Sequence, residues 1–201
     1  MDRRDSTRAQ RNRSRIAQTT ARLIAEHGLT DWNAAKRKAC RELGLPDREA
    51  LPDNDEVEQA LRDYNNLFLS DEQPARLRQQ RLEALRWMER LSEWKPVLTG
   101  AVAAGWATAH SEVRLELEAE DAKGVELALI NAGVEYNSAP DPSGAGPRVQ
   151  LHVENPRVTL RLVIVSPVER RNRPRRGRSA EAEGRLGIAQ LRALLACEGE
   201  S

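Results

Sequence analysis

The sequence predicts an α+β protein whose N-terminal half is helical and whose C-terminal half combines strands with helices. Up to about residue 94, apolar residues recur at spacings of three and four, which is the period of an amphipathic helix. After Pro96 the pattern changes to short apolar runs and to one strictly alternating run, SEVRLELEA, which are typical of strands. This order of elements favours a mixed or antiparallel sheet with helices around it.

A basic tail at residues 1–15 is expected to precede a helical region at residues 16–94. The first helix of that region spans about 14 residues. It stops at Gly28, because glycine readily adopts the left-handed conformation that ends a helix. Thr30 or Asp31 caps the second helix, since a side-chain oxygen at this position accepts a backbone N–H.

The third and fourth helices follow a turn-rich stretch, LPDREALPDND. Asp53 or Asn54 caps the third helix, in which apolar residues recur at helical spacing from Val57 to Phe68. Pro74 fits the first turn of the fourth helix, which is expected to run to about Glu93.

A unit that contains the sheet is expected at residues 95–168. Its predicted strands are VLTG, SEVRLELEA, VEYN, RVQLHVE and VTLRLVIV, and a helix at residues 121–132 separates the second strand from the third. Asn155-Pro156 indicates a hairpin between the last two strands. An arginine-rich linker at residues 169–180 and a C-terminal helix and tail at residues 181–201 complete the expected domain organisation.

The charge of the chain is nearly balanced overall but unevenly distributed. Charged residues make up 31% of the chain, and the formal net charge is +1. A guanidinium that neutralises a phosphate releases counterions, so dense arginine clusters favour an anionic partner, nucleic acid above all. A solvated tail and linker is the alternative interpretation. The clusters are Arg3, Arg4, Arg8, Arg11, Arg13 and Arg15 at the start, and Arg170, Arg171, Arg173, Arg175, Arg176 and Arg178 near the end.

Cysteine usage and hydropathy limit the cellular setting. Cys40 and Cys197 have no His or Cys at ligand spacing, which indicates two thiols in a reducing compartment. No apolar run approaches the roughly 20 residues that a membrane span needs. The arginine-rich start has no apolar core behind it, unlike a secretory signal. We therefore expect a soluble, cytoplasmic protein that does not contact a membrane.

The segment TGAVAAGWATAHSEVRLELE is the candidate site. It reads as a strand, a loop that contains Gly100 and Gly105, a short helix and a second strand. Glycine lets backbone N–H groups approach phosphate oxygens, and a helix N-terminus adds a favourable partial charge. The loop therefore predicts a phosphate site, with a tight turn required by packing as the alternative.

Taken together, these features resemble the nucleotidyltransferase family related to DNA polymerase beta. That family's signature is Gly-Ser, a second glycine four residues after the serine, and then Ser-Asp-x-Asp-Leu. Here Gly100-Ala101 stands at the Gly-Ser pair, Gly105 at the second glycine, and residues 111–115 (SEVRL) at the last motif without a gap. The resemblance covers roughly residues 80–165 and implies a nucleotidyltransferase-like mixed sheet.

The resemblance also implies two Mg²⁺ ions, held by carboxylates at positions i and i+2 of one strand and by a third on a later strand. Glu112 keeps the first carboxylate, but Arg114 reverses the charge of the second. The last predicted strand offers Thr159 and Arg161 where the third acid belongs, and Ala101 lacks the serine hydroxyl. We therefore expect no cofactor and a protein that is degenerate for two-metal transfer but binds a nucleotide or nucleic acid.

The residues expected to line the nucleotide are Gly100, Ala101, Gly105, Ser111 and Arg114, and the arginines of residues 170–178 would contact nucleic acid. Arg114 either binds phosphate with its guanidinium fork or forms an ion pair with Glu112 or with an acid further along its strand. Trp106 either stacks on a base or covers the sheet edge.

Three alternative functions remain open at this point. One is an active Mg²⁺-dependent transferase that uses Glu112 as a catalytic residue with a second acid, which would be Glu116, Glu118 or Glu154. Another is a module for protein interaction. The third is a TetR-like DNA-binding regulator, because LIAEHGL resembles the first helix of such domains, although the acidic stretch that follows would repel phosphate.

Overall fold

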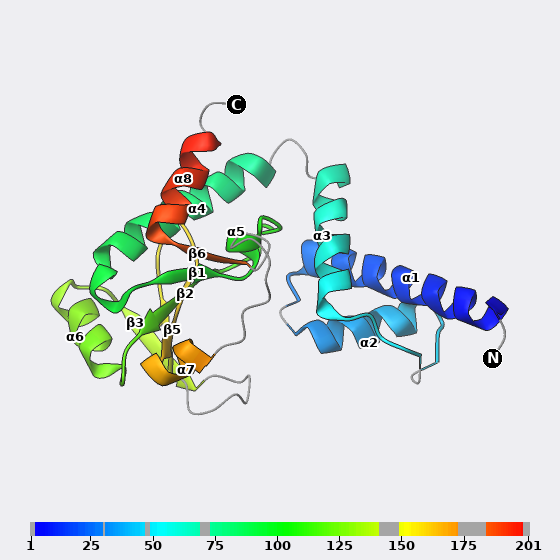
Figure 1. Cartoon of the computed structure of the whole chain (residues 1–201), viewed down its shortest axis with the longest axis horizontal. Coiled ribbons are helices and arrows are strands. Elements are labelled where there is room, and N and C mark those ends of the chain that lie inside the picture. The colour runs from blue at the N-terminus through cyan, green and yellow to red at the C-terminus, as the bar shows by residue number, and fades with distance from the viewer. Residues whose placement is uncertain are drawn as a thin grey trace. The chain divides into compact units, whose positions relative to one another are not determined.

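A computed structural model describes residues 3–29, 31–46, 49–68, 73–140, 149–172 and 184–198. The chain divides into a helical unit, residues 1–74 with 108–110, and a sheet unit, residues 75–107 with 111–201. The described residues form eight α-helices and one six-stranded mixed sheet, so the predicted α+β class is confirmed. Figure 1 labels these helices and strands.

The helical unit contains α1 (Arg3–His27), α2 (Trp32–Glu42) and α3 (Asn54–Phe68), and α1 packs against both of the others. Ile16 and Leu23 of α1 are buried with Ala39 and Cys40 of α2. Asp31 caps α2 by accepting the Ala34 N–H at 3.0 Å, which is one of the two caps that the sequence predicted.

Helix α1 is longer than the apolar periodicity predicts, because it begins at Arg3 and includes much of the expected basic tail. Arg13 donates to Glu56 at 2.6 Å and to Asp53 at 3.2 Å. Asn12 donates to Glu49 at 3.0 Å. These polar contacts, rather than apolar packing, join this part of α1 to its own unit, so a search for apolar residues misses it.

The described part of the sheet unit has four strands and four helices besides the predicted strand, glycine turn, short helix and strand. Its helices are α4 (Gln73–Arg90), α5 (Ala101–Ala104), α6 (Lys123–Asn131), α7 (Pro167–Asn172) and α8 (Ile188–Cys197), and its strands are β1 (Val97–Thr99), β2 (Val113–Glu118), β3 (Tyr136–Pro140), β4 (Val149–Val153), β5 (Leu160–Val165) and β6 (Arg185–Gly187). Within the expected arginine-rich linker, α7 extends to Asn172, and β6 precedes the C-terminal helix that was predicted.

The strand order is β3-β4-β5-β2-β1-β6. β2 runs parallel to β5, and every other neighbouring pair is antiparallel, including the predicted hairpin of β4 and β5. The central strand β2 therefore lies between β5, which comes 42 residues or more after it in the chain, and β1, which carries the glycine turn.

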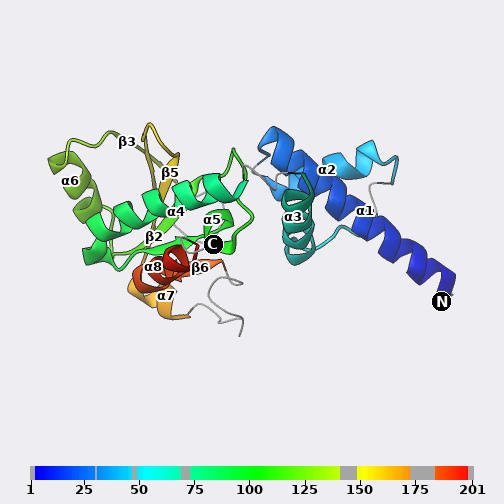
Figure 2. The ribbon, with the colours of Figure 1, turned by 90° about the horizontal axis from the view of Figure 1, so that it is seen from above.

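One face of this sheet is the core. Leu98, Leu115 and Leu162 from three neighbouring strands belong to a single cluster with Met88 of α4 and Leu191 of α8. Figures 1 and 2 show α4 running across the strands. The side chains that alternate with these leucines point to the opposite face. The strict alternation of β2 predicted a half-exposed strand. Arg114 and Glu118 on that opposite face are half-buried, but Glu116 between them is buried, so the expectation fails at Glu116.

Within the described ranges, no helix is both long enough and apolar enough to cross a membrane. Cys40 is buried, Cys197 is exposed, and neither takes part in a disulfide.

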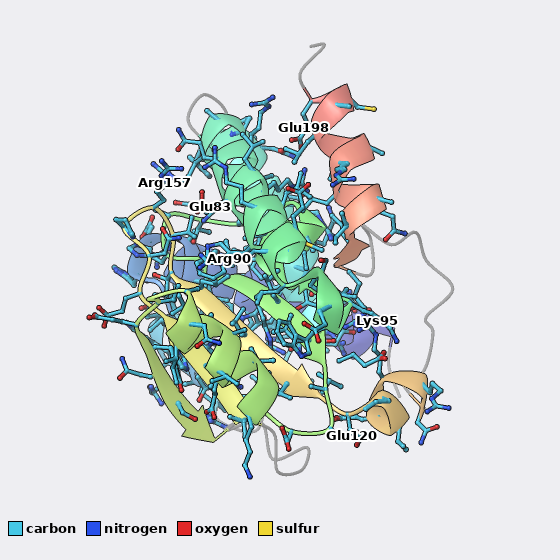
Figure 3. The ribbon with its side chains drawn as sticks, turned by 90° about the vertical axis from the view of Figure 1, so that its left-hand side faces the viewer. Glu83, Arg90, Lys95, Glu120, Arg157 and Glu198 are labelled. Carbon is cyan, nitrogen blue, oxygen red and sulfur yellow. The ribbon has the colours of Figure 1, made fainter. Side chains whose placement is uncertain are left out.

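Glu83 of α4 holds the turn between β4 and β5, as its closeness to Arg157 in Figure 3 illustrates. Its carboxylate accepts from Asn155 at 3.2 Å, from Arg157 at 3.5 Å and from Arg86 at 2.8 Å. Burial alone would raise the pKa of Glu83, but the hydrogen bonds from Asn155 and Arg86 outweigh it, so this pKa lies below the ordinary value of 4.5.

Glu83→Gln is expected to lower the free energy of unfolding at pH 7 by about 1–2 kcal/mol, because hydrogen bonds to a charged acceptor are lost. A carboxyl whose pKa falls on folding stabilises the protein above its unfolded pKa and loses that effect as pH falls through the folded pKa. The difference between the variant and the native chain should therefore shrink below pH 4.5. Urea titrations from pH 7 to pH 3 measure this difference, with Glu120→Gln as control because Glu120 is exposed. A difference that does not change with pH would contradict the assignment.

Candidate functional site

The glycine turn joins β1 to β2 in the arrangement that the sequence predicts. Gly100 has φ +76° and ψ −152°, a conformation that is essentially restricted to glycine. The helix α5 follows at once and ends at Gly105, with φ +83°. A Cβ on Gly100 would meet no atom within 4 Å, so glycine is needed there for its backbone angles and not for space.

The turn packs against the segment that leads into β6. The Gly100 N–H donates to the Gly184 carbonyl at 3.1 Å, so this donor is already satisfied and is not presented to a phosphate. A Cβ on Gly184 would lie 3.3 Å from Cβ of Ala104. Packing therefore explains part of the glycine pattern, as the alternative interpretation proposed.

Arg81 of α4 fixes the other end of this turn. Its side chain is only 3% exposed, and it donates to the carbonyls of Val102 at 3.1 Å and Ala103 at 3.4 Å. It also forms an ion pair with Glu198, next to the end of α8. The last carbonyls of a helix receive no hydrogen bond from an N–H of that helix. Arg81 supplies this hydrogen bond to two carbonyls of α5 and so joins α5 to α4 and α8.

Gly100→Ala is expected to destabilise the sheet unit by about 1–3 kcal/mol, the cost of placing a side chain at these backbone angles. Gly124→Ala is the matched control, since Gly124 lies in helix α6 and a Cβ there would make only ordinary contacts with Trp94. That substitution should be neutral or stabilising, because alanine favours helix more than glycine. Thermal unfolding of both variants measures the contrast, and equal effects would contradict it.

Three arginines form one row across the opposite face of the sheet. The backbone register places Arg161 of β5 opposite Arg114 of β2, Arg114 opposite Thr99 of β1, and Thr99 opposite Arg185 of β6. Residues that are paired across strands point to the same face, and neighbouring strands lie about 4.8 Å apart. His152 of β4 extends the row beyond Arg161. We call Arg114, Arg161 and Arg185 the arginine row.

Two carboxylates accompany the arginine row. Glu112 pairs with Arg161 at 2.6 Å, and Glu116 pairs with Arg185 at 2.7 Å. The Glu112 side chain is 27% exposed, whereas that of Glu116 is 8% exposed. The sequence predicted these acids as partners for Arg114 and did not identify Arg161 or Arg185 as partners. In the sequence, Arg161 stands out only because it lies where the resemblance implies a third carboxylate. Arg185 lies in a strand of three residues, which is too short to show a periodic pattern.

The side chains of this face do not fit a pair of Mg²⁺ ions. The positions where the resemblance implies carboxylates hold one acid, Glu112, and two guanidiniums, Arg114 and Arg161, which the register places side by side. Mg²⁺ prefers oxygen ligands, and a nearby cation raises the free energy of a bound metal ion. Across the described part of the chain, no three His, Cys, Asp or Glu side chains come together as metal ligands.

The other predicted site residues fall at different places. Ala101 is the half-buried first residue of α5, and Ser111 precedes β2, where its carbonyl accepts from Gln80 at 3.1 Å. Trp106 is buried in the same connection, with 8% of the residue exposed. Of its two open roles, this burial argues against stacking on a base.

The arginines expected to bind nucleic acid are only partly described. Arg170 donates to the Lys95 carbonyl at 2.7 Å and lies 3.5 Å from the Glu118 carboxylate, so it joins α7 to the start of β1 and the end of β2. Arg171 donates to the Pro167 carbonyl at 3.3 Å. Arg173, Arg175, Arg176 and Arg178 lie outside the described residues.

Neither a search of protein-family models nor a search of curated protein sequences finds a match to this chain.

Proposed function

We propose that this chain is a nucleotidyltransferase-like protein that is degenerate for two-metal transfer and binds the phosphates of a nucleotide or nucleic acid on the arginine row. The observation that carries the proposal is the register of β5, β2, β1 and β6, which brings Arg161, Arg114 and Arg185 to one face. Two of these side chains, Arg161 and Arg185, are 22% and 27% exposed, so a ligand can reach them.

The order of elements supports the family resemblance. A strand, a glycine turn, a short helix and a second strand follow one another from Val97 to Glu118. A later strand then places Arg161 beside Arg114, at the position where the family would hold its third carboxylate. Replacement of two acids by arginines at adjacent positions changes the preferred ligand from a divalent cation to an anion.

The chemistry of the side chains supports a phosphate ligand in particular. A guanidinium presents its N–H groups in a planar fork that matches two phosphate oxygens, and such charge-assisted hydrogen bonds are stronger than neutral ones. Three of the four acids that an active transferase would use are already held by cations. Glu112 pairs with Arg161, Glu116 with Arg185, and Glu118 with Lys95 at 2.6 Å.

Fluorescence polarisation of the full chain with a labelled nucleoside triphosphate, a single-stranded oligonucleotide and a duplex tests the proposal. Binding is expected at low salt and should weaken as salt rises. Arg114→Ala should weaken it, whereas Arg192→Ala should not, since Arg192 pairs with Glu89 on the exposed surface of α8. No binding by any of these ligands at low salt, or equal binding by both variants, would defeat the proposal.

A further inference from the structure

The ion pair between Glu112 and Arg161 occupies one of the guanidinium groups that the proposed function assigns to phosphate. Its oxygen and nitrogen lie 2.6 Å apart, and both side chains remain about a quarter exposed. Glu112 precedes the first residue of β2, so its backbone is not part of the paired strand. This carboxylate can therefore swing away from Arg161 while the sheet stays intact.

The pair between Glu116 and Arg185 differs in this respect. Glu116 is a paired residue within β2 and its side chain is 8% exposed, so the buried carboxylate needs its cation. Displacement of Glu116 would leave a buried charge without its partner, whereas displacement of Glu112 returns a carboxylate to water. Of the two, Glu112 is the acid that a ligand can replace.

We infer that Glu112 occupies the position of a ligand phosphate on Arg161, and that a pyrophosphate group without bound Mg²⁺ displaces it to lie across Arg114 and Arg161. This inference rests on the proposed function and narrows its ligand to a nucleoside diphosphate or triphosphate, or to inorganic pyrophosphate. Glu112 then determines specificity, because only a ligand with more negative charge than a carboxylate competes well for the same guanidinium.

The spacing and charge of the two arginines select pyrophosphate over a single phosphate. Arg114 and Arg161 lie on neighbouring strands, about 4.8 Å apart at the backbone. Two linked phosphates can give each guanidinium fork its own pair of oxygens, whereas one phosphate must be shared. Mg²⁺ would take some of these oxygens and cancel two negative charges, so it should weaken binding at this site.

Isothermal titration of the full chain with inorganic pyrophosphate and with orthophosphate, in EDTA and in excess Mg²⁺, tests the inference. Pyrophosphate in EDTA should bind about tenfold or more tightly than orthophosphate. Glu112→Gln removes the charge that competes for Arg161 and keeps the side-chain size, so it should tighten pyrophosphate binding by about tenfold. Glu89→Gln is the matched control, since Glu89 also pairs with an arginine at 2.6 Å but lies on helix α4 and not in the arginine row. This substitution should leave pyrophosphate binding unchanged.

The possible failures are distinguishable. Weaker or unchanged pyrophosphate binding in Glu112→Gln, with circular dichroism like that of the native chain, would overturn the inference, as would tighter binding in Mg²⁺. If an oligonucleotide binds and Arg114→Ala abolishes that binding while pyrophosphate does not bind, the inference fails and the proposed function stands. If no phosphate-bearing ligand binds, both fail.

Discussion

Replacement of both Arg114 and Arg161 by alanine is expected to lower the affinity for a nucleoside triphosphate by more than a hundredfold. Each guanidinium contributes charge-assisted hydrogen bonds worth roughly 1.5–3 kcal/mol, so loss of both corresponds to two or more powers of ten in the dissociation constant. Titration of a fluorescent nucleotide measures the effect. Glu112, which loses its partner in this variant, is 27% exposed and can be hydrated, so the fold should persist.

The double variant needs a control that removes the same charge elsewhere. The double variant Arg90→Ala with Arg192→Ala provides this control. Arg90 lies in α4 over the Trp87 ring, and Arg192 lies in α8, where it pairs with Glu89. This control removes two positive charges without touching the arginine row. Equal losses of affinity in the two double variants would show that net charge, rather than the arginine row, governs binding.

Arg81→Ala is expected to destabilise the sheet unit by about 2–4 kcal/mol, because it breaks a partly buried ion pair and leaves helix carbonyls without their donor. The arginine contacts Val102, Ala103 and Glu198, so α5 should lose its connection to α4 and α8. Hydrogen exchange resolved by segment measures the effect, and the loss of protection should be largest for residues 97–118.

Segment-resolved exchange is preferred because the chain has two units, which need not unfold together. The helical unit provides an internal reference, and protection of α1 and α3 should stay unchanged in Arg81→Ala. Arg192→Ala should cost less than about 1 kcal/mol, since its pair with Glu89 is exposed. A loss in Arg81→Ala no larger than in Arg192→Ala would contradict a bridging role for Arg81.

The local elements of the candidate site could be predicted from the sequence. Alternation identified β2, and the two glycines identified the turn, because the conformation of Gly100 is a local property of the backbone. Asp31 as a helix cap was likewise readable from a single residue and its neighbours. Such features depend on interactions within a few positions of the chain.

The arginine row could not be predicted, because it depends on register between distant strands. A shift of two residues in β5 would put Thr159 or Val163 beside Arg114 in place of Arg161, and nothing local fixes that shift. Arg185 belongs to a three-residue strand, too short for any period to appear. The burial of Glu116 is also set by a neighbour far along the chain, Arg185, so its polarity wrongly indicated an exposed side chain.

The proposed function depends on phosphate binding to the arginine row without a metal ion. Equilibrium titration of the native chain with a nucleoside triphosphate in EDTA, followed by addition of Mg²⁺ or Mn²⁺, tests it most directly. We expect saturable binding in EDTA that is weaker after the metal is added. Binding that appears only when the metal is present would contradict it.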